Sequence, residues 1–281
     1  MLRSIVAAAD SSDEGRATIV TAVRLGQCSG ARVTVLTVAE SDANGERSPR
    51  LLEDLRETVA SQLAGVEPPH PAVDVAVEVG LPGIEIARFA ETSGADLVVV
   101  GRKRRTSLQR LMVGDTADSV ARRSRIPCLF VRAGMGPIAR VLVALDGTER
   151  GLAIFPVALE FARETKALLR ATTVEPAIPN EVDAPWVHHG RSARLADALS
   201  AMGRRGVSGD GGARFEVPVE PWLIVHRGQV IEEVLKEVRH SDADVLVLGC
   251  RRGGPPGSME AGSIARRLLH VCPTAVLTVP V

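Results

Sequence analysis

The sequence contains no tyrosine, and aromatic residues make up only 2% of its 281 residues. Proteins that bind single-stranded nucleic acid stack bases on aromatic side chains, and this chain offers few such platforms. The chain also carries no net charge, because its 34 Lys and Arg residues balance its 34 Asp and Glu residues. No overall field therefore attracts nucleic acid or an anionic membrane. We expect neither as a partner, and an anion site has to be local.

Long apolar runs and paired cysteines are lacking as well. The first apolar run is ended by Asp10, too early for the core of a signal peptide or for a membrane span. The cysteines are Cys28, Cys128, Cys250 and Cys272, with no C-x-x-C pair among them. Such spacing suggests neither a zinc site nor a disulfide framework. We interpret the opening run as the first strand of a cytoplasmic protein.

Catalytic motifs are not found either. The chain has neither the G-x-S-x-G turn of serine hydrolases nor the G-x-x-x-x-G-K-[ST] loop of common ATPases. His188 and His189 are adjacent, but no further ligand follows at metal-binding spacing, so we expect a solvated loop. His226 and His270 have no evident partner in the sequence. We therefore predict no catalytic residue and no metal site, and favour a binding protein over an enzyme.

What the sequence does contain is an internal repeat. Residues 5–15, IVAAADSSDEG, match residues 141–151, VLVALDGTERG, so that Asp10 corresponds to Asp146. Farther on, Gly80, Asp96, Gly101 and Gly114 correspond to Gly228, Asp244, Gly249 and Gly262 at one constant offset. Halves of this length have the size of single domains. We predict one domain at 1–133 and a second at 138–281, joined by a glycine-containing linker.

Each half alternates short β-branched runs with longer amphipathic ones. In the first half the predicted strands are 4–9, 32–38, 73–79, 96–100 and 128–131, and the predicted helices are 12–28, 49–63, 82–92 and 115–124. The runs at 97–100 and 245–248 are apolar throughout, which is typical of strands buried between helix layers. The pattern predicts an α/β fold of two tandem Rossmann-like or flavodoxin-like domains, each a five-stranded parallel sheet with helices on both faces.

In such sheets, ligands bind where the strands end. The fourth strand of the second half is followed by a long glycine-rich loop, residues 249–263, and loops of that length are often functional. The loop brings Gly262 and Ser263 to a helix start, where free N–H groups and the positive end of the helix dipole favour phosphate. Arg251 and Arg252 add countercharge. We expect this loop to hold the phosphates of a nucleotide.

The tandem halves, the Asp-Gly-Thr turn at 146–148 and the spacing Gly249-x2-Arg252-x9-Gly262-Ser263 resemble the universal stress protein family. The resemblance covers nearly the whole chain and weakens only across 176–221. It implies an adenine nucleotide alpha hydrolase-like fold. It also implies binding of an adenine nucleotide, ATP with magnesium, by a sensor or regulator of the stress response.

The resemblance places Asp146 beside the adenine or ribose, Val174 at the base, and the loop around the phosphates. In the C-terminal half the implied nucleotide-binding residues are Asp146, Gly147, Val174, Gly228, Gly249, Arg252, Gly262 and Ser263. In the N-terminal half the corresponding, weaker set is Asp10, Val38, Gly80, Gly101, Arg104, Gly114 and Asp115. An alternative role for Asp146 is to cap the turn that follows it, and the two roles are compatible.

Both halves depart from the family's motif, which is Gly-x2-Gly-x9-Gly-Ser/Thr in nucleotide-binding members. The second glycine is Arg104 in one half and Arg252 in the other, and each arginine either fills the phosphate space or grips the phosphates. Asp115 stands where Ser or Thr is expected, and its carboxylate repels a phosphate. The basic run 102–105 supplies compensating charge. The C-terminal half is therefore the better predicted site.

Two other functions stay open on the sequence alone. One is a scaffold of the same fold without nucleotide, acting through protein contacts, and the other is a slow ATP hydrolase. Each half ends in an apolar strand, and an exposed edge of that kind is normally covered. We expect the two halves to cover each other as an intramolecular pseudo-dimer, with a homodimer of chains as a further arrangement.

Overall fold

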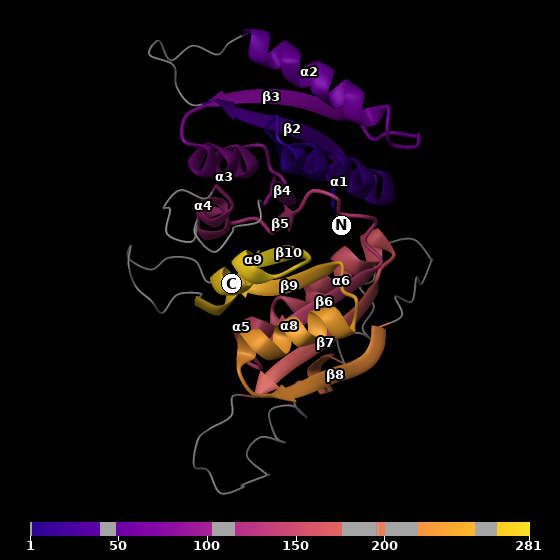
Figure 1. Cartoon of the computed structure of the whole chain (residues 1–281), viewed down its shortest axis with the longest axis vertical. Helices are drawn as coiled ribbons and strands as arrows, with labels where there is room; N and C mark the ends of the chain where they lie inside the picture. The colour runs from indigo at the N-terminus through magenta and orange to yellow at the C-terminus, as the bar shows by residue number, and fades with distance from the viewer. Residues whose placement is uncertain are drawn as a thin grey trace, which may run out of the picture. The chain divides into compact units, whose positions relative to one another are not determined.

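The computed structural model of the protein describes residues 2–39, 49–102, 116–175, 195, 197–199, 219–250 and 263–281. Its described part divides into two compact units (Figure 1). One comprises Met1–Pro137 and Cys250–Pro280, and the other comprises Ile138–Gly249 with Val281. The last helix and strand of the second sequence repeat thus belong to the first unit. The domain limits at 133 and 138 stay a prediction.

The first unit is built on a sheet of order β3-β2-β1-β4-β5-β10. Its strands are β1 (Ser4–Ala8), β2 (Arg32–Ala39), β3 (Val73–Val79), β4 (Leu97–Gly101), β5 (Cys128–Val131) and β10 (Ala275–Pro280). The first five are parallel in their pairings, whereas β10 runs antiparallel to β5. The helices are α1 (Asp13–Ser29), α2 (Pro49–Leu63), α3 (Pro82–Thr92), α4 (Thr116–Arg123) and α9 (Ser263–Val271).

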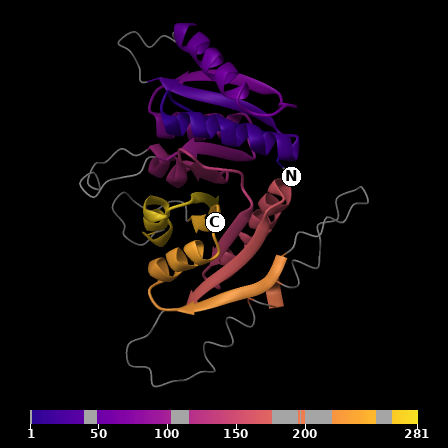
Figure 2. The same cartoon turned by 45° about the vertical axis from the view of Figure 1, so that its right-hand side comes forward.

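The second unit repeats this plan with a parallel sheet of order β9-β6-β7-β8. Its strands are β6 (Arg140–Leu145), β7 (Leu168–Glu175), β8 (Val219–Arg227) and β9 (Val245–Cys250), and its helices are α5 (Glu149–Leu152), α6 (Phe155–Thr165) and α8 (Val230–His240). Figure 2 shows the long strands β7 and β8 side by side. The predicted α/β class and the alternation of strands and helices are confirmed.

Burial explains why the apolar runs form the central strands. All four positions of 97–100 are buried, as are those of 245–248, because helices flank these strands and leave no side open to solvent. The predicted start of α1 is also confirmed. Ser12 is its N-cap, and the Oγ of Ser12 accepts a hydrogen bond from the backbone N–H of Gly15 at 3.1 Å. None of the helices in the described residues is both long and apolar enough to span a bilayer.

A repeated aspartate fastens the fourth strand to the first in each repeat. The Oδ2 atom of Asp96 accepts hydrogen bonds from the backbone N–H groups of Arg3 and Ser4 at 2.8 and 3.0 Å. The corresponding residue Asp244 accepts from Ala139 and Arg140, both at 2.8 Å. The two repeats therefore share contacts as well as sequence. In each repeat these contacts hold the start of the fourth strand beside the start of the first strand.

Candidate functional site

The candidate residues of the first repeat lie where parallel strands end. Asp10 follows β1, Val38 lies near the end of β2, Gly80 follows β3 and Gly101 ends β4. Neighbouring strands stay paired to their ends, since the backbone N–H of Gly80 donates to the carbonyl of Ala39 at 2.9 Å. The structure thus brings these four to one sheet edge. Arg104, Gly114 and Asp115 lie outside the described residues.

The carboxylate of Asp10 shapes the turn between β1 and α1. Its Oδ1 atom accepts hydrogen bonds from the backbone N–H of Ser12, at 3.1 Å, and from the Ser12 hydroxyl. A Cβ atom on Gly15 would lie 2.0 Å from the backbone oxygen of Asp10, so only glycine fits there. The Asp10–Gly15 pattern seen in the sequence is therefore a packing requirement of this turn.

The same turn recurs in the second repeat. Asp146 Oδ1 accepts from the backbone N–H and the hydroxyl of Thr148 at 2.9 and 2.6 Å. The Thr148 Oγ1 atom in turn accepts from the N–H of Gly151 at 3.0 Å. The turn-capping role considered for Asp146 is confirmed. Asp146 is nevertheless exposed, and its Oδ2 atom takes part in neither bond with Thr148.

The other described candidates of the second repeat lie at the corresponding strand ends. Val174 lies near the end of β7, in register with His226 of β8, and Gly228 directly follows β8. Gly228 and Gly80 share a φ of 144°, a conformation that favours glycine. Arg252 and Gly262 lie outside the described residues, and Ser263 is the first residue of α9.

The two glycines that end the fourth strands have different surroundings. A Cβ atom on Gly101 would lie 2.9 Å from the Cβ of Glu14 at the start of α1, which is too close. On Gly249 the nearest atom would be 3.4 Å away, an ordinary contact. Packing therefore explains the glycine at 101 but not the glycine at 249.

Comparison with known proteins agrees with this architecture. The model of the universal stress protein family matches residues 1–132 and again residues 137–280. The chain belongs to the universal stress protein family. A universal stress protein of Archaeoglobus fulgidus has a similar solved structure, with a TM-score of 0.71 at 17% identity, covering 99% of this chain and 98% of that one.

Other relatives match single stretches or single repeats. The universal stress protein MJ0531 of Methanocaldococcus jannaschii is 40% identical over 53 residues, which is 19% of this chain and 31% of that protein. The matches span about a third of the length of the curated relatives. A universal stress protein solved in complex with cAMP is 25% identical, covering 47% of this chain and 98% of that one with a TM-score of 0.40.

Arg102, in the basic run of this universal stress protein, has a structural role. Its side chain is buried, with 4% exposed, and its Nη2 atom donates to the carbonyls of Cys272 at 3.0 Å and Thr274 at 2.7 Å. Its Nη1 atom donates to the carbonyl of Leu269, near the end of α9, where a positive charge is favourable. The expectation that the whole run supplies phosphate countercharge is therefore wrong for Arg102. The rest of the run lies outside the described residues.

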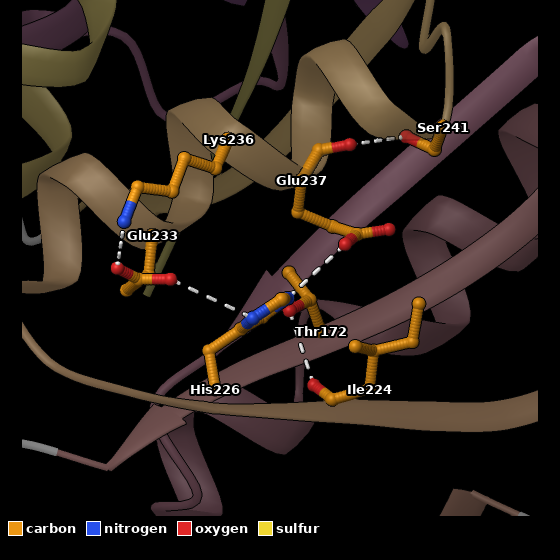
Figure 3. Close-up of polar contacts among 7 residues, drawn as sticks. All are labelled: Thr172, Ile224, His226, Glu233, Lys236, Glu237 and Ser241. Carbon is orange, nitrogen blue, oxygen red and sulfur yellow. Dashed lines mark hydrogen bonds and ion pairs between the residues drawn. The ribbon is translucent and has the colours of Figure 1, made fainter.

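His226, which the sequence left without a partner, lies among carboxylates (Figure 3). Its Nε2 atom is 3.1 Å from Oε2 of Glu237, and its Nδ1 atom is 3.7 Å from Oε2 of Glu233. Glu237 is buried, with 2% exposed. Lys236 donates to Oε1 of Glu233 at 2.6 Å, and this bond raises the pKa of Lys236. The sequence signal was the spacing of Glu233 and Glu237, which places both on one helix face.

His270 also has a partner that the sequence did not reveal. Its Nε2 atom lies 3.8 Å from Oδ1 of Asp118, a buried carboxylate on α4. The expectation that this histidine stands alone is therefore wrong. His226 and His270 thus both lie beside carboxylates.

Burial keeps two of the thiols, those of Cys128 and Cys250, in the protonated form. Burial raises the pKa of Cys128 to about 12, and burial also raises the pKa of Cys250, whose Sγ atom lies 3.5 Å from the carbonyl of Ala121. Thiols held protonated in this way are poor nucleophiles and poor metal ligands. Within the described residues, no three His, Cys, Asp or Glu side chains are grouped to hold a metal ion. His188 and His189 lie outside that part of the chain.

Proposed function

We propose that this universal stress protein binds an adenine nucleotide, ATP with magnesium, through its second repeat and acts in the cytoplasm as a sensor or regulator of the stress response. The observation that carries the proposal is the strand-end turn of Asp146. It presents an exposed carboxylate, with one oxygen fixed by Thr148, at the sheet edge where β7 and β8 also end. Ligands of doubly wound sheets bind at this edge.

Each part of the nucleotide has proposed partners. The Oδ2 atom of Asp146 accepts from the ribose hydroxyls or the adenine, and Val174 offers apolar surface to the base. Gly147 and Gly228 let the backbone approach the sugar. The phosphates lie along Gly249, Arg252, Gly262 and Ser263, where helix N–H groups and the guanidinium neutralise their charge. The absence of a packing reason for glycine at 249 supports this assignment.

The first repeat is proposed as the weaker site. Gly101 is required by its contact with Glu14, and the guanidinium of Arg102 is committed to α9. Asp115 adds a negative charge at the predicted helix start. In this half Gly101 thus serves packing, and neither Arg102 nor Asp115 favours a phosphate.

We further propose that the two repeats associate through their last strands. The antiparallel pairing of β5 with β10, one strand from each repeat, supports such an intramolecular pseudo-dimer. The alternative function is a scaffold without nucleotide that acts through protein contacts. Two further alternatives are a homodimer of whole chains and a slow hydrolysis of ATP, and experiments on the purified protein distinguish them.

Thermal unfolding with and without ATP and magnesium tests the nucleotide proposal. We expect a rise in melting temperature for the wild type, loss of that rise in Gly262→Glu, and retention in the matched control Gly114→Glu in the first repeat. A carboxylate at 262 would occupy the phosphate position and repel it. GTP with magnesium serves as the ligand control.

Nucleotide analysis of the freshly purified protein gives an independent readout. No bound nucleotide and no thermal shift at millimolar ATP would favour the scaffold. Loss of the shift in Gly114→Glu alone would move the site to the first repeat. Steady release of ADP would favour the enzyme.

A further inference from the structure

The antiparallel pair β5–β10 places equivalent residues of the two repeats opposite each other. Leu129 lies across from Leu277, with Phe130 across from Val276 on one side and Cys128 across from Thr278 on the other. Leu129 and Leu277 are separated by the same number of residues as Gly80 and Gly228. Each repeat's last strand therefore meets its own counterpart, as it would across a two-fold axis.

A second set of contacts follows the same relation. Arg102 donates to the carbonyl of Leu269, and Cys250, the counterpart of Arg102, lies 3.5 Å from the carbonyl of Ala121, the counterpart of Leu269. The two-fold relation thus extends from the strands to the ends of α4 and α9. The chemistry at equivalent positions nevertheless differs, since one residue is a cation and the other a thiol.

The helices bring one more pair of counterparts together, Asp118 on α4 and Arg266 on α9, which are 148 residues apart. The Nε atom of Arg266 donates to Oδ1 of Asp118 at 2.9 Å, and the carboxylate is buried, with 6% exposed. Arg122 lies 3.5 Å from its other oxygen, and His270, the counterpart of Arg122, lies 3.8 Å from Oδ1. One acidic side chain is therefore compensated by cations from both repeats.

A two-fold contact between two like repeats would lose this complementarity. Two first repeats would bring Asp118 against a second Asp118, and two second repeats would bring Arg266 against a second Arg266. Like charges at close range cost free energy, and the cost grows with burial. Specific interfaces commonly combine attraction for the right partner with repulsion of the wrong one.

We propose that Asp118 and Arg266 form a selectivity pair. The pair favours packing of α4 and β5 of the first repeat against the α9–β10 segment of the second repeat, and it disfavours packing against the α4–β5 segment of another first repeat. The partner that fits this surface is thus a segment of the same chain. The inference rests on the proposed association of the repeats, and it is independent of nucleotide binding.

Charge reversal in the full-length chain tests the pair. Asp118→Arg places two arginines together and Arg266→Asp two aspartates, whereas the double variant restores an opposite-charge pair in reverse order. Asp118→Asn and Arg266→Gln remove the attraction without adding repulsion and are the matched controls. Melting temperature reports stability, and hydrogen exchange of the β10 amides reports release of the segment.

We expect each reversal to lower the melting temperature by about 4 to 10 °C and to speed exchange in β10, more than its neutral control does. Because position 118 is buried, 1 M salt reduces the excess over the control only in part. The double variant recovers at least half of the loss. A double variant as unstable as the two reversals combined, or reversals equal to their neutral controls, overturns the proposal.

The nucleotide proposal is tested separately, because the ATP-dependent shift is measured in the wild type. A failure of the charge-reversal series leaves that shift unaffected, and a missing shift leaves the reversal series interpretable. Preserved exchange protection of β10 in both reversals would overturn the selectivity pair while leaving the association of the repeats through these strands standing.

Discussion

The Nε2 atom of His226 lies 3.1 Å from Oε2 of Glu237, a carboxylate buried on the inner face of α8. Phe89 occupies the position of Glu237 in the first repeat, and Glu78 the position of His226. In that repeat Arg88 compensates Glu78 and Glu85, at 3.3 and 2.5 Å. In the second repeat the carboxylate of Glu237 is therefore buried, and the imidazole of His226 lies beside it.

Removal of the imidazole should therefore be costly. We expect His226→Leu to lower the free energy of unfolding by about 2 to 4 kcal/mol, because a buried carboxylate is left without its partner. The double variant His226→Leu with Glu237→Leu should recover most of this loss, since no charge remains to be buried. Urea unfolding at pH 7 measures both. A double variant less stable than His226→Leu would show that the pair acts through packing and not through charge.

The turn of Asp10 makes a prediction about a single methyl group. In Gly15→Ala the new Cβ would lie 2.0 Å from the Asp10 backbone oxygen, which is part of the chain and has little freedom to retreat. We expect a loss of about 1 to 3 kcal/mol in unfolding free energy. Gly136→Ala is the control, because no atom lies within 4 Å of its added Cβ. Equal stabilities of the two variants would contradict the close approach.

Much of this architecture could be predicted from the sequence, because short stretches of residues determine where its strands and helices begin and end. The limits of β3, β5, α2 and α3 agree with prediction, since apolar periodicity and flanking Pro or Gly residues define them. The strand-end position of Asp10 and Gly80 followed from topology alone.

Other features depend on tertiary contacts that carry no local signal. Arg102 stands in a basic run that resembles a phosphate loop, yet it ends up buried because α9, far along the chain, leaves carbonyls to be satisfied. The order of the strands along the sequence likewise could not predict that α9 and β10 belong to the first compact unit. The constant offset between the repeats could have indicated the Asp118–Arg266 contact, since these two residues occupy equivalent positions and are opposite in charge.

Arg102 should be more important for stability than for ligand binding. Arg102→Met removes hydrogen bonds to the carbonyls of Cys272 and Thr274 while keeping an apolar stem, and we expect a loss of about 2 to 4 kcal/mol by urea unfolding. Arg125→Ala is the control. Its side chain is 73% exposed and lies 3.8 Å from Glu91, so its loss should change stability by less than about 1 kcal/mol. Weakened ATP affinity in a folded Arg102→Met protein would reinstate a phosphate role.

Asp118 should give the protein part of its acid sensitivity. Burial by itself raises the pKa of this carboxyl, but His270, Arg266 and Arg122 outweigh burial and leave the pKa below its ordinary value. A carboxyl with a lowered folded pKa stabilises the fold above its unfolded pKa of about 3.9, and this contribution is lost as the pH falls through the folded value.

Asp118→Asn should therefore be less stable than the wild type by about 1 to 3 kcal/mol at pH 7, where the carboxylate is charged in both states. The gap should narrow once the pH falls below about 5, because the wild type then takes up a proton on unfolding that the variant cannot. Urea unfolding of both proteins at several pH values between 7 and 3.5 measures the gap. A gap that is constant over this range would mean that the substituted amide disturbs packing and that the charge of Asp118 contributes nothing.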